Sequence, residues 1–293
     1  MTRAILRAHA KINLYLKILG RRPDGYHEIE SVVQTVSLHD SLEFETADRF
    51  ELEVDPPAVP ANRDNLVWKA AEALLEGRPA RGARIILRKR IPIGAGLGGG
   101  SSDAAAALVG LDRLWGQGGG EERLRKIAAG LGSDVPLFLV GGMVRVGGRG
   151  TEVDPLVDLP SAQLVLVHPG VPVSTREIYA QVQEPLTPRV KTGSIPAFGK
   201  DSPGSLEGWV RLGNDLESIA GRFCPAIREI KERLLLAGAS AAAMTGSGSA
   251  VFGLFGTEDD ASRAAKEMER LGWRAWSCVP IGRALYKTHL GLI

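Results

Sequence analysis

The chain has 293 residues, enough for two domains with a hydrophobic core each. Its hydrophobic fraction of 44% and charged fraction of 24% are ordinary for a globular protein, and a formal net charge of +2 gives no general attraction to nucleic acid or anionic membranes. No apolar run approaches the roughly 20 residues of a membrane span, and no signal peptide is recognisable. We therefore expect a cytoplasmic protein, in which Cys224 and Cys278 are buried and reduced.

The chain begins with a series of predicted strands. Alternating apolar residues indicate strands over 4–8, 12–19 and 28–37, and two more at LEFETA and FELEV. Lys11 lies just before the second of these strands and Asn13 near its start, and the two share one side of an extended segment. A lysine in such a place is most often solvated, although its apolar neighbours also suit a positioned ammonium.

A turn at Pro23-Asp24-Gly25 precedes Tyr26 and His27. A phenol ring and an imidazole at the foot of a turn can stack on a ligand base and hydrogen-bond to it. A purely structural histidine fits the same pattern, so the two interpretations remain open on spacing alone. Beyond this turn, a helix is predicted over 62–75 and a strand over 83–87.

The segment PIGAGLGGGSSDAAAAL, residues 92–108, places glycines and two serines directly before an alanine-rich helix predicted over 102–115. Its glycines allow the backbone to come close to a ligand. We expect Ser101 or Ser102 to cap the helix, with Asp103 in its first turn. Free N–H groups and the positive end of the helix dipole then suit a phosphate.

Two familiar phosphate motifs do not fit this segment. A P-loop has lysine after its last glycine, whereas Gly100 is followed by Ser101. The glycine spacing matches a dinucleotide fingerprint, but that motif has an acidic residue at the end of the next strand. Asp112 has nearly the right spacing and lies inside the predicted helix instead.

The middle of the chain closes a first domain, which we place at residues 1–156. A helix is predicted over 121–131, and Asp134 follows it in GSDVP, where Pro136 is typical of a helix start. The simplest interpretation of Asp134 is therefore an N-cap. GGMVRVGGRGTEV is expected to form a hairpin.

The second domain, residues 157–293, alternates helices with strands. A strand over 163–167 precedes a short helix that Ser174 or Thr175 caps and that carries Tyr179. Helical residues are expected at GNDLES, over 225–236 and over 258–271, and strands at AAAMTGSGSAVFGLF and over 273–279. Residues 184–208, rich in proline, glycine and serine, are expected to form a loop.

Three glycine-containing segments stand in order: AKINLYLKILGRRPDGYHEIES, PIGAGLGGGSSDAAAAL and MTGSGSAVFGLF. Together they resemble the GHMP small-molecule kinases over nearly the whole chain. The resemblance implies an α+β fold with an N-terminal nucleotide-binding domain like a ribosomal protein domain and a C-terminal ferredoxin-like α/β layer. The first segment, with GSDVP and GNDLE, is most similar to members that phosphorylate the 2-hydroxyl of a cytidine diphosphate ester of methylerythritol in the non-mevalonate isoprenoid pathway.

The resemblance also implies the site residues and cofactors. Lys11 and Asp134 fall on the catalytic positions. The implied ATP contacts are Asn65, Lys89, Pro92, Gly94, Gly96, Gly98, Gly99, Gly100, Ser101 and Ser102. The implied substrate contacts are Asn13, Tyr26, His27, Thr175, Tyr179, Gly246 and Ser247. ATP and Mg²⁺ are the implied cofactors, with Ser102 helping to hold the Mg²⁺ and no separate metal site.

Two features depart from the family pattern: His9 stands where proline is common, and residues 184–208 match no segment of the family that we can place from the sequence. Three alternatives remain: a kinase for homoserine or mevalonate, a metabolite-binding relative without catalysis, and a nucleic-acid-binding module. GRRPDGYHE argues against the first and the intact Lys11 and Asp134 against the second, while the near-neutral charge argues against the third. We expect a monomer or a weak homodimer.

Overall fold

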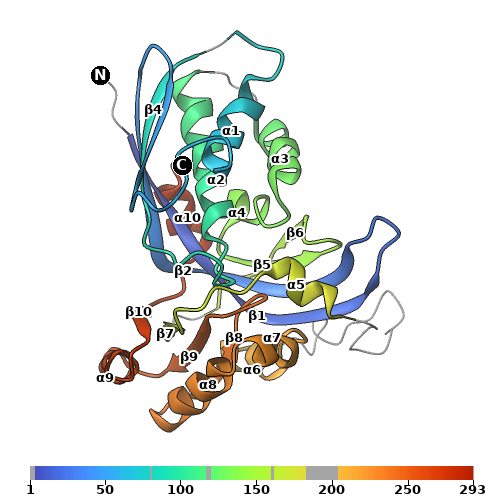
Figure 1. Cartoon of the computed structure of the whole chain (residues 1–293), viewed down its shortest axis with the longest axis vertical. Helices are drawn as coiled ribbons and strands as arrows, with labels where there is room; N and C mark the ends of the chain where they lie inside the picture. Colours follow the sequence, from blue (N-terminus) through green and yellow to red (C-terminus); the bar gives the residue numbers. More distant parts are fainter. Residues whose placement is uncertain (1–3, 80, 117–119, 160–161, 183–203, 293) are drawn as a thin grey trace.

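The computed structural model describes residues 4–79, 81–116, 120–159, 162–182 and 204–292, which form two sheets and the helices packed on them (Figure 1). The first sheet has the order β3-β4-β2-β5-β6, with β1 paired to β2. Its strands are β1 (Ala4–Arg21), β2 (His27–Glu45), β3 (Phe50–Asp55), β4 (Ala83–Arg88), β5 (Met143–Gly147) and β6 (Glu152–Pro155). All its pairs are antiparallel except β3 with β4.

The second sheet has the order β10-β7-β9-β8, and all its pairs are antiparallel. Its strands are β7 (Gln163–His168), β8 (Ala241–Met244), β9 (Val251–Phe255) and β10 (Arg274–Cys278). In chain order this is the arrangement 4-1-3-2, which confirms the expected ferredoxin-like layer. The helices of this half are α5 (Thr175–Ala180), α6 (Leu206–Arg211), α7 (Glu217–Phe223), α8 (Ala226–Leu236) and α9 (Glu258–Arg270).

The two short strands expected at the start of the chain are one long strand, β1. At the break that we expected between them, β1 continues and only its pairing with β2 shifts in register. His9 pairs with His39, but Lys11 pairs with Thr35. Residues of β2 between these partners leave the ladder because the Ser37 N–H donates to the Val279 carbonyl, at 2.8 Å. The strands expected at 28–37 and LEFETA likewise merge into β2.

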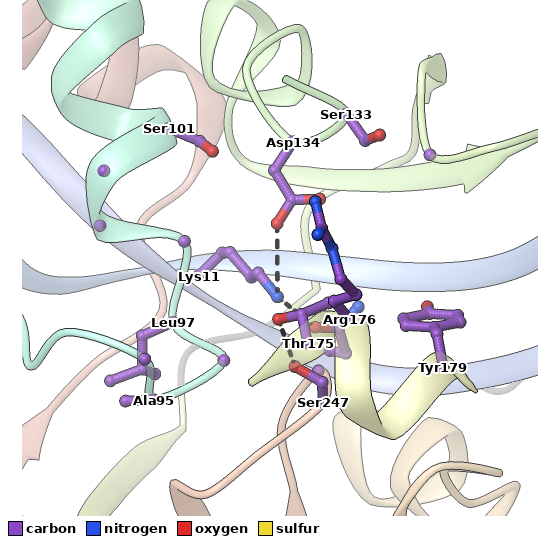
Figure 2. Close-up of a pocket in the computed structure, with 18 of the residues that line it drawn as sticks. Lys11, Ala95, Leu97, Ser101, Ser133, Asp134, Thr175, Arg176, Tyr179 and Ser247 are labelled. Atoms are coloured by element: carbon purple, nitrogen blue, oxygen red, sulfur yellow. Dashed lines mark hydrogen bonds and ion pairs between the residues drawn. The ribbon is translucent and has the colours of Figure 1, made fainter. Parts of the chain in front are cut away.

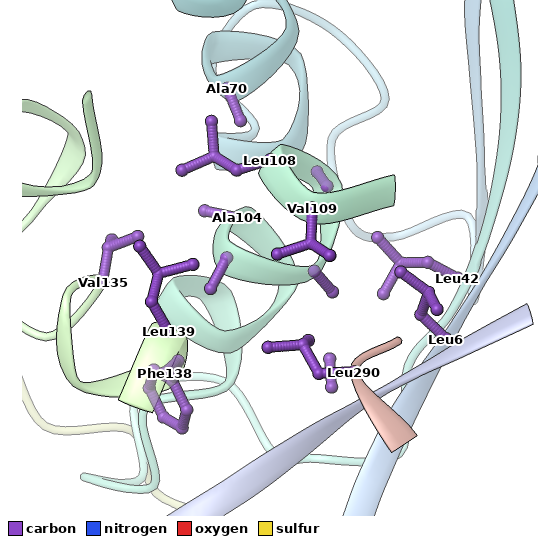
Figure 3. Packing of buried hydrophobic residues seen from close by; sticks show 14 of the residues in the cluster. Leu6, Leu42, Ala70, Ala104, Leu108, Val109, Val135, Phe138, Leu139 and Leu290 are labelled. Atoms are coloured by element: carbon purple, nitrogen blue, oxygen red, sulfur yellow. The ribbon is translucent and has the colours of Figure 1, made fainter. Parts of the chain in front are cut away.

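Helix α2 (Gly99–Leu114) occupies the centre of the first core, between α1 (Leu66–Leu75), α4 (Leu137–Val140) and the sheet (Figure 3). Its alanine run is fully buried, and these small side chains allow the helix to lie close to its neighbours. At Gly110 an added Cβ would lie 2.4 Å from the ring of Phe44, so the sheet touches the helix backbone there. Helix α3 (Gly120–Leu131) completes this layer.

The predicted serine cap of α2 is wrong. The helix begins at Gly99, its N-cap is Gly98 at φ +70°, and no side chain caps it. Because Gly98 adopts the left-handed conformation without a Cβ penalty, the first turn forms three residues earlier than expected, and Ser101 and Ser102 lie inside the helix. Helix α1 begins later than expected, at Leu66, because the side chain of Asn65 accepts a hydrogen bond from the Val67 N–H.

The last helix, α10 (Arg283–His289), was not predicted and packs into the first core. Its Tyr286 is fully buried, and the hydroxyl donates to the Phe138 carbonyl at 2.6 Å. Most of the expected loop at 184–208 lies outside the described residues, and its end begins α6. Both cysteines are buried, as expected. Among the described helices, none has the length and apolar character to cross a bilayer.

Candidate active site

A cavity of about 1090 Å³ lies between the β1–β2 hairpin, the glycine-rich segment and α5. Every residue that the sequence assigned to catalysis, ATP or substrate lines it, except Ser102. The predicted site is therefore one continuous space, assembled from both halves of the chain.

The glycine-rich segment runs along the cavity and leads into the first turn of α2. Gly96 and Gly98 both have positive φ, at +75° and +70°. An added Cβ at Gly96 would lie 2.3 Å from the Thr245 carbonyl oxygen, and one at Gly98 would lie 2.8 Å from Cζ of Phe138. The backbone thus takes a path that only glycine allows, and the N-terminus of α2 opens toward the cavity.

Lys11 lies beneath this segment. Its backbone N–H donates to the Leu97 carbonyl at 3.0 Å, and its Nζ donates to Asn13 Oδ1 at 2.5 Å. The side chain is buried, and Nζ is 3.8 Å from Oδ2 of Asp134 (Figure 2). Burial lowers the pKa of Lys11, while the Asp134 carboxylate offsets part of that effect. The positioned ammonium is thus the correct interpretation, and a solvated lysine is not.

Asp134 is not an N-cap. The N-cap position of α4 is Pro136, without a side-chain cap, and Asp134 lies in the turn before it. Its carboxylate is 41% exposed and faces the cavity beside the Lys11 ammonium (Figure 2). A proton acceptor and a fixed cation therefore lie side by side at the wall of the cavity.

Asn13 fixes the position of the Lys11 ammonium through hydrogen bonds. Its Oδ1 accepts from Lys11 and, at 3.4 Å, from the Thr245 hydroxyl, while its Nδ2 donates to Ser31 Oγ at 2.8 Å. The third glycine segment closes the same space, because a Cβ at Gly246 would lie 3.1 Å from Lys11 Nζ. The ammonium therefore has little freedom to move.

Thr175 and Ser247 join the two halves of the site. Ser174 is the N-cap of α5, where its side chain accepts from the Glu177 N–H, which decides between the two candidates for the cap. The Thr175 hydroxyl is thereby left to meet Ser247, at 2.8 Å between the two oxygens (Figure 2). α5 is thus tied to the third glycine segment.

Aromatic side chains gather at the end of the cavity formed by the β1–β2 turn. The rings of His27 and Tyr179 lie 5.3 Å apart, and the guanidinium of Arg149 lies 5.3 Å from the centre of the half-exposed Tyr26 ring. Burial and the positive charge of nearby Arg21 lower the pKa of His27. A hydrogen bond to the Val182 backbone raises it, but by less. The His27 imidazole is therefore neutral near pH 7, with one donor and one acceptor nitrogen.

The serines of α2 behave differently from each other. Ser101 lines the cavity, whereas Ser102 is fully buried and does not reach it. Its hydroxyl oxygen has no hydrogen-bond partner within the ranges that the structure describes. Successive residues of a helix point about 100° apart, so a helix that begins at Gly99 turns Ser102 into the core. The ATP and Mg²⁺ contacts expected of Ser102 do not agree with this position.

Comparisons with known proteins match both halves of the chain to one family. The model of the GHMP kinases N terminal domain matches residues 65–142, and that of the GHMP kinases C terminal matches residues 192–272. A 4-diphosphocytidyl-2-C-methyl-D-erythritol kinase of Pelotomaculum thermopropionicum is 43% identical over 268 residues, which cover 90% of this chain and 93% of that protein. The chain belongs to the GHMP kinase family.

Solved structures show the same relationship for this GHMP kinase. A crystal structure of 4-(cytidine 5'-diphospho)-2C-methyl-D-erythritol kinase matches it with a TM-score of 0.77 at 38% identity, covering 95% of this chain and 100% of that one. A homoserine kinase from Cytophaga hutchinsonii has a TM-score of 0.67 at 19% identity, covering 96% and 95%, and shows the shared fold alone. Membership of this kinase family implies that the chain uses ATP.

Two oxygen-bearing side chains of the cavity are of the kind that Mg²⁺ prefers. No group of three or more His, Cys, Asp or Glu residues in the described ranges could hold a metal ion. Mg²⁺ prefers oxygen ligands and usually takes them from one or two protein groups, from phosphates and from water. The Ser101 hydroxyl and the Asp134 carboxylate line the cavity and are groups of this kind.

Sequence reasoning missed several residues of the site. Ser31 and Thr245 are ordinary polar residues on strands or turns, and nothing local singles them out. Asp40 carries a clearer signal, because it is the one acidic residue in the alternating inward row Val36, Leu38, Asp40, Leu42 and Phe44. A charge at a position that the strand period assigns to the core requires buried partners.

Proposed function

We propose that this GHMP kinase transfers the γ-phosphoryl group of ATP to the 2-hydroxyl of 4-diphosphocytidyl-2-C-methyl-D-erythritol, giving the 2-phosphate and ADP. The observation that carries the proposal is the Lys11–Asp134 pair, located between the glycine-rich start of α2 and the aromatic residues of the β1–β2 turn. The relatives that bear the name of this activity support the choice of substrate. The reaction is a step of the non-mevalonate route to isoprenoid precursors.

The start of α2 holds the phosphates of ATP. The N–H groups of its first turn have no intrahelical partners, and together with the helix dipole they attract an anion. The glycines let the phosphate oxygens approach the backbone without a side chain between them. The Ser101 hydroxyl lines the cavity here and would be a ligand for Mg²⁺, which would supply positive charge against the phosphates when bound.

Asp134 accepts the proton of the 2-hydroxyl as that oxygen attacks. Its exposed carboxylate faces the cavity, and Lys11 fixes its position from 3.8 Å away. Phosphoryl transfer places most of the developing charge on oxygen, so catalysis depends on positioning and on nearby positive charge. Lys11 supplies this charge, and Asn13 keeps its ammonium in place.

The cytidine group binds at the aromatic end. The N–H of neutral His27 donates to the Val182 backbone, so its other ring nitrogen can accept a hydrogen bond from the cytosine amino group, while Tyr26 and Tyr179 offer ring faces on which the base can stack. A small alcohol such as homoserine or mevalonate has no group that uses these rings. The aromatic end therefore favours a nucleotide-bearing substrate over the small alcohols.

A coupled assay of ADP release, with ATP and Mg²⁺, tests the proposal with three alcohols: the cytidylyl substrate, homoserine and mevalonate. We expect turnover with the cytidylyl substrate only. Turnover with homoserine or mevalonate instead would retain the kinase and reject the assignment of Tyr26 and His27. Folded protein that binds ADP but turns over none of the three would indicate a relative without catalysis.

We also propose that the enzyme works in the cytoplasm. Two free, buried cysteines suit a reducing compartment.

A further inference from the structure

Three charged side chains form a buried cluster at the point where the chain leaves the first sheet for the glycine-rich segment. Lys89 follows β4, and its ammonium donates to carboxylate oxygens of both Asp40, on β2, and Asp103, on α2. The bond to Asp103 measures 2.7 Å. All three side chains are at least nine-tenths buried, and Lys89 and Asp103 line the active-site cavity.

Asp40 also holds the main chain at this point. β2 and β4 pair in register as far as Ser41 with Arg88. Beyond that pair, Oδ1 of Asp40 accepts from the backbone N–H groups of Arg90 and Ile91, the latter at 2.9 Å. The side chain of Asp40 thus takes over from the β-ladder where β4 ends, and it fixes the direction in which residues 92–98 leave the sheet.

The Lys89 ammonium lies against the first turn of α2. An added Cβ at Gly99 would be 3.2 Å from its Nζ, and the same Cβ would be 2.9 Å from the side chain of Ile91. Burial alone would lower the pKa of Lys89, but the two carboxylates outweigh it and the pKa is raised, so the side chain is a cation throughout the physiological range. A fixed positive charge therefore stands beside the N–H groups of the helix start.

We propose that Asp40 is a positioning residue for nucleotide binding, with Asp103 as its partner. Asp40 holds the Lys89 ammonium beside the start of α2 with one oxygen and the backbone before the glycine-rich segment with the other. It touches no substrate itself, since it is fully buried and does not line the cavity. The inference rests on the proposed function only in taking the ligand of this end of the site to be the adenine nucleotide.

The substitution Asp40→Asn tests the two contacts of Asp40, to the Lys89 ammonium and to the backbone N–H groups that follow it. An asparagine side chain keeps the shape but has one acceptor oxygen, and its NH₂ group must face either the Lys89 ammonium or the backbone N–H groups. Either Lys89 then keeps only Asp103 as a partner, or the N–H groups of Arg90 and Ile91 lose their acceptor. Glu43→Gln is the matched control, because Glu43 is a buried carboxylate on the same strand that pairs with Arg88 and does not line the cavity.

Isothermal titration with ADP measures the effect directly. We expect Asp40→Asn to raise the Kd for ADP at least about tenfold, with Glu43→Gln within about twofold of wild type. In the kinase assay, Asp40→Asn is expected to raise the KM for ATP while the KM for the cytidylyl substrate stays unchanged. A merely structural role would lower the melting temperature of both variants and leave ADP affinity intact.

An ADP Kd in folded Asp40→Asn that equals the wild-type value, or is tighter, would overturn the proposal. If this variant does not fold, Asp103→Asn serves instead, and an unchanged ADP Kd there has the same meaning. Because the titration needs no phosphoryl acceptor, its result is independent of the substrate panel. A wild-type protein that binds ADP but does not phosphorylate the cytidylyl compound would contradict the proposed function and leave this inference standing.

Discussion

Replacing Gly96 with alanine perturbs the glycine-rich segment at its tightest point. Gly96 has φ +75°, and the new Cβ would lie 2.3 Å from the Thr245 carbonyl oxygen and 3.1 Å from the Gly248 nitrogen. Both neighbours are backbone atoms, and Thr245 is held by the hydrogen bond from its N–H to the Ala250 carbonyl. The contact cannot be relieved by rotating a side chain, so the loop itself must shift.

The cost follows from these contacts. A left-handed conformation costs a residue with a Cβ about 1–2 kcal/mol. The Thr245 hydroxyl shares its one hydrogen between the Gly96 carbonyl and Asn13 Oδ1, and losing the bond to Gly96 adds about 0.5–1.5 kcal/mol. We therefore expect Gly96→Ala to lower the free energy of unfolding by roughly 1.5–3.5 kcal/mol, before any residual overlap is counted. The displaced loop should also weaken ADP binding.

Gly100→Ala is the matched control for stability in the same segment. Its φ is not positive, and the added Cβ would meet only Cδ1 of Leu66, at an ordinary 3.6 Å. Alanine is up to about 1 kcal/mol better than glycine in a helix, so this variant should be as stable as wild type or more so. Urea unfolding of both variants measures the difference. Equal unfolding free energies for Gly96→Ala and wild type would refute the reasoning.

Three further predictions concern catalysis, substrate recognition and pH. Asp134→Asn and Lys11→Ala should each lower kcat by about 10²–10⁴ while the melting temperature stays near wild type, and near-normal kcat in either variant would remove that residue from the mechanism. Tyr26→Ala and His27→Ala should raise the KM for the cytidylyl substrate and not that for ATP; steady-state kinetics with each substrate varied would show an unchanged KM if the assignment is wrong. Burial lowers the pKa of His9 from 6.5 to about 3, although the hydrogen bond to the Val36 backbone opposes this shift. Below pH 6.5 the unfolded chain therefore binds a proton that the folded chain does not. Stability should therefore fall as the pH drops, by about 2 kcal/mol from His9 at pH 5, and urea unfolding at pH 7 and 5 should show a smaller loss in His9→Gln. An equal loss in both proteins would contradict this origin.

Local pattern predicted much of the fold. The alternation of β1 correctly placed Lys11 and Asn13 on one side of the strand, where their side chains hydrogen-bond. Residues 258–271 and 225–236 had clear helical periodicity and are helices α9 and α8 within a residue or so at each end. The last helix, α10, was missed because it is short and its position depends on packing of Tyr286 against a distant part of the chain.

The sequence predicted the parts of the site that depend on glycine conformation. It predicted less well the side chains whose partners are distant in the sequence. The glycines were expected to let the backbone come close to a ligand, and Gly96 and Gly98 do adopt the positive φ that this path requires. Whether Asp134 is a cap or faces the cavity depends on Lys11, which lies far away in sequence and close in space. Ser102 was misplaced because its direction depends on the first residue of α2, and the cap at Gly98 moved that start by three residues.

The position of the new phosphate tests the central claim most directly. After incubation with ATP, Mg²⁺ and substrate labelled with ¹³C at C2 of the methylerythritol, NMR of the product reports which oxygen carries the phosphoryl group. We predict a phosphomonoester on the 2-hydroxyl that shows phosphorus coupling to C2, formed in step with ADP. A phosphate on another oxygen, or ADP without any new ester, would contradict the arrangement in which Asp134 and Lys11 activate that hydroxyl.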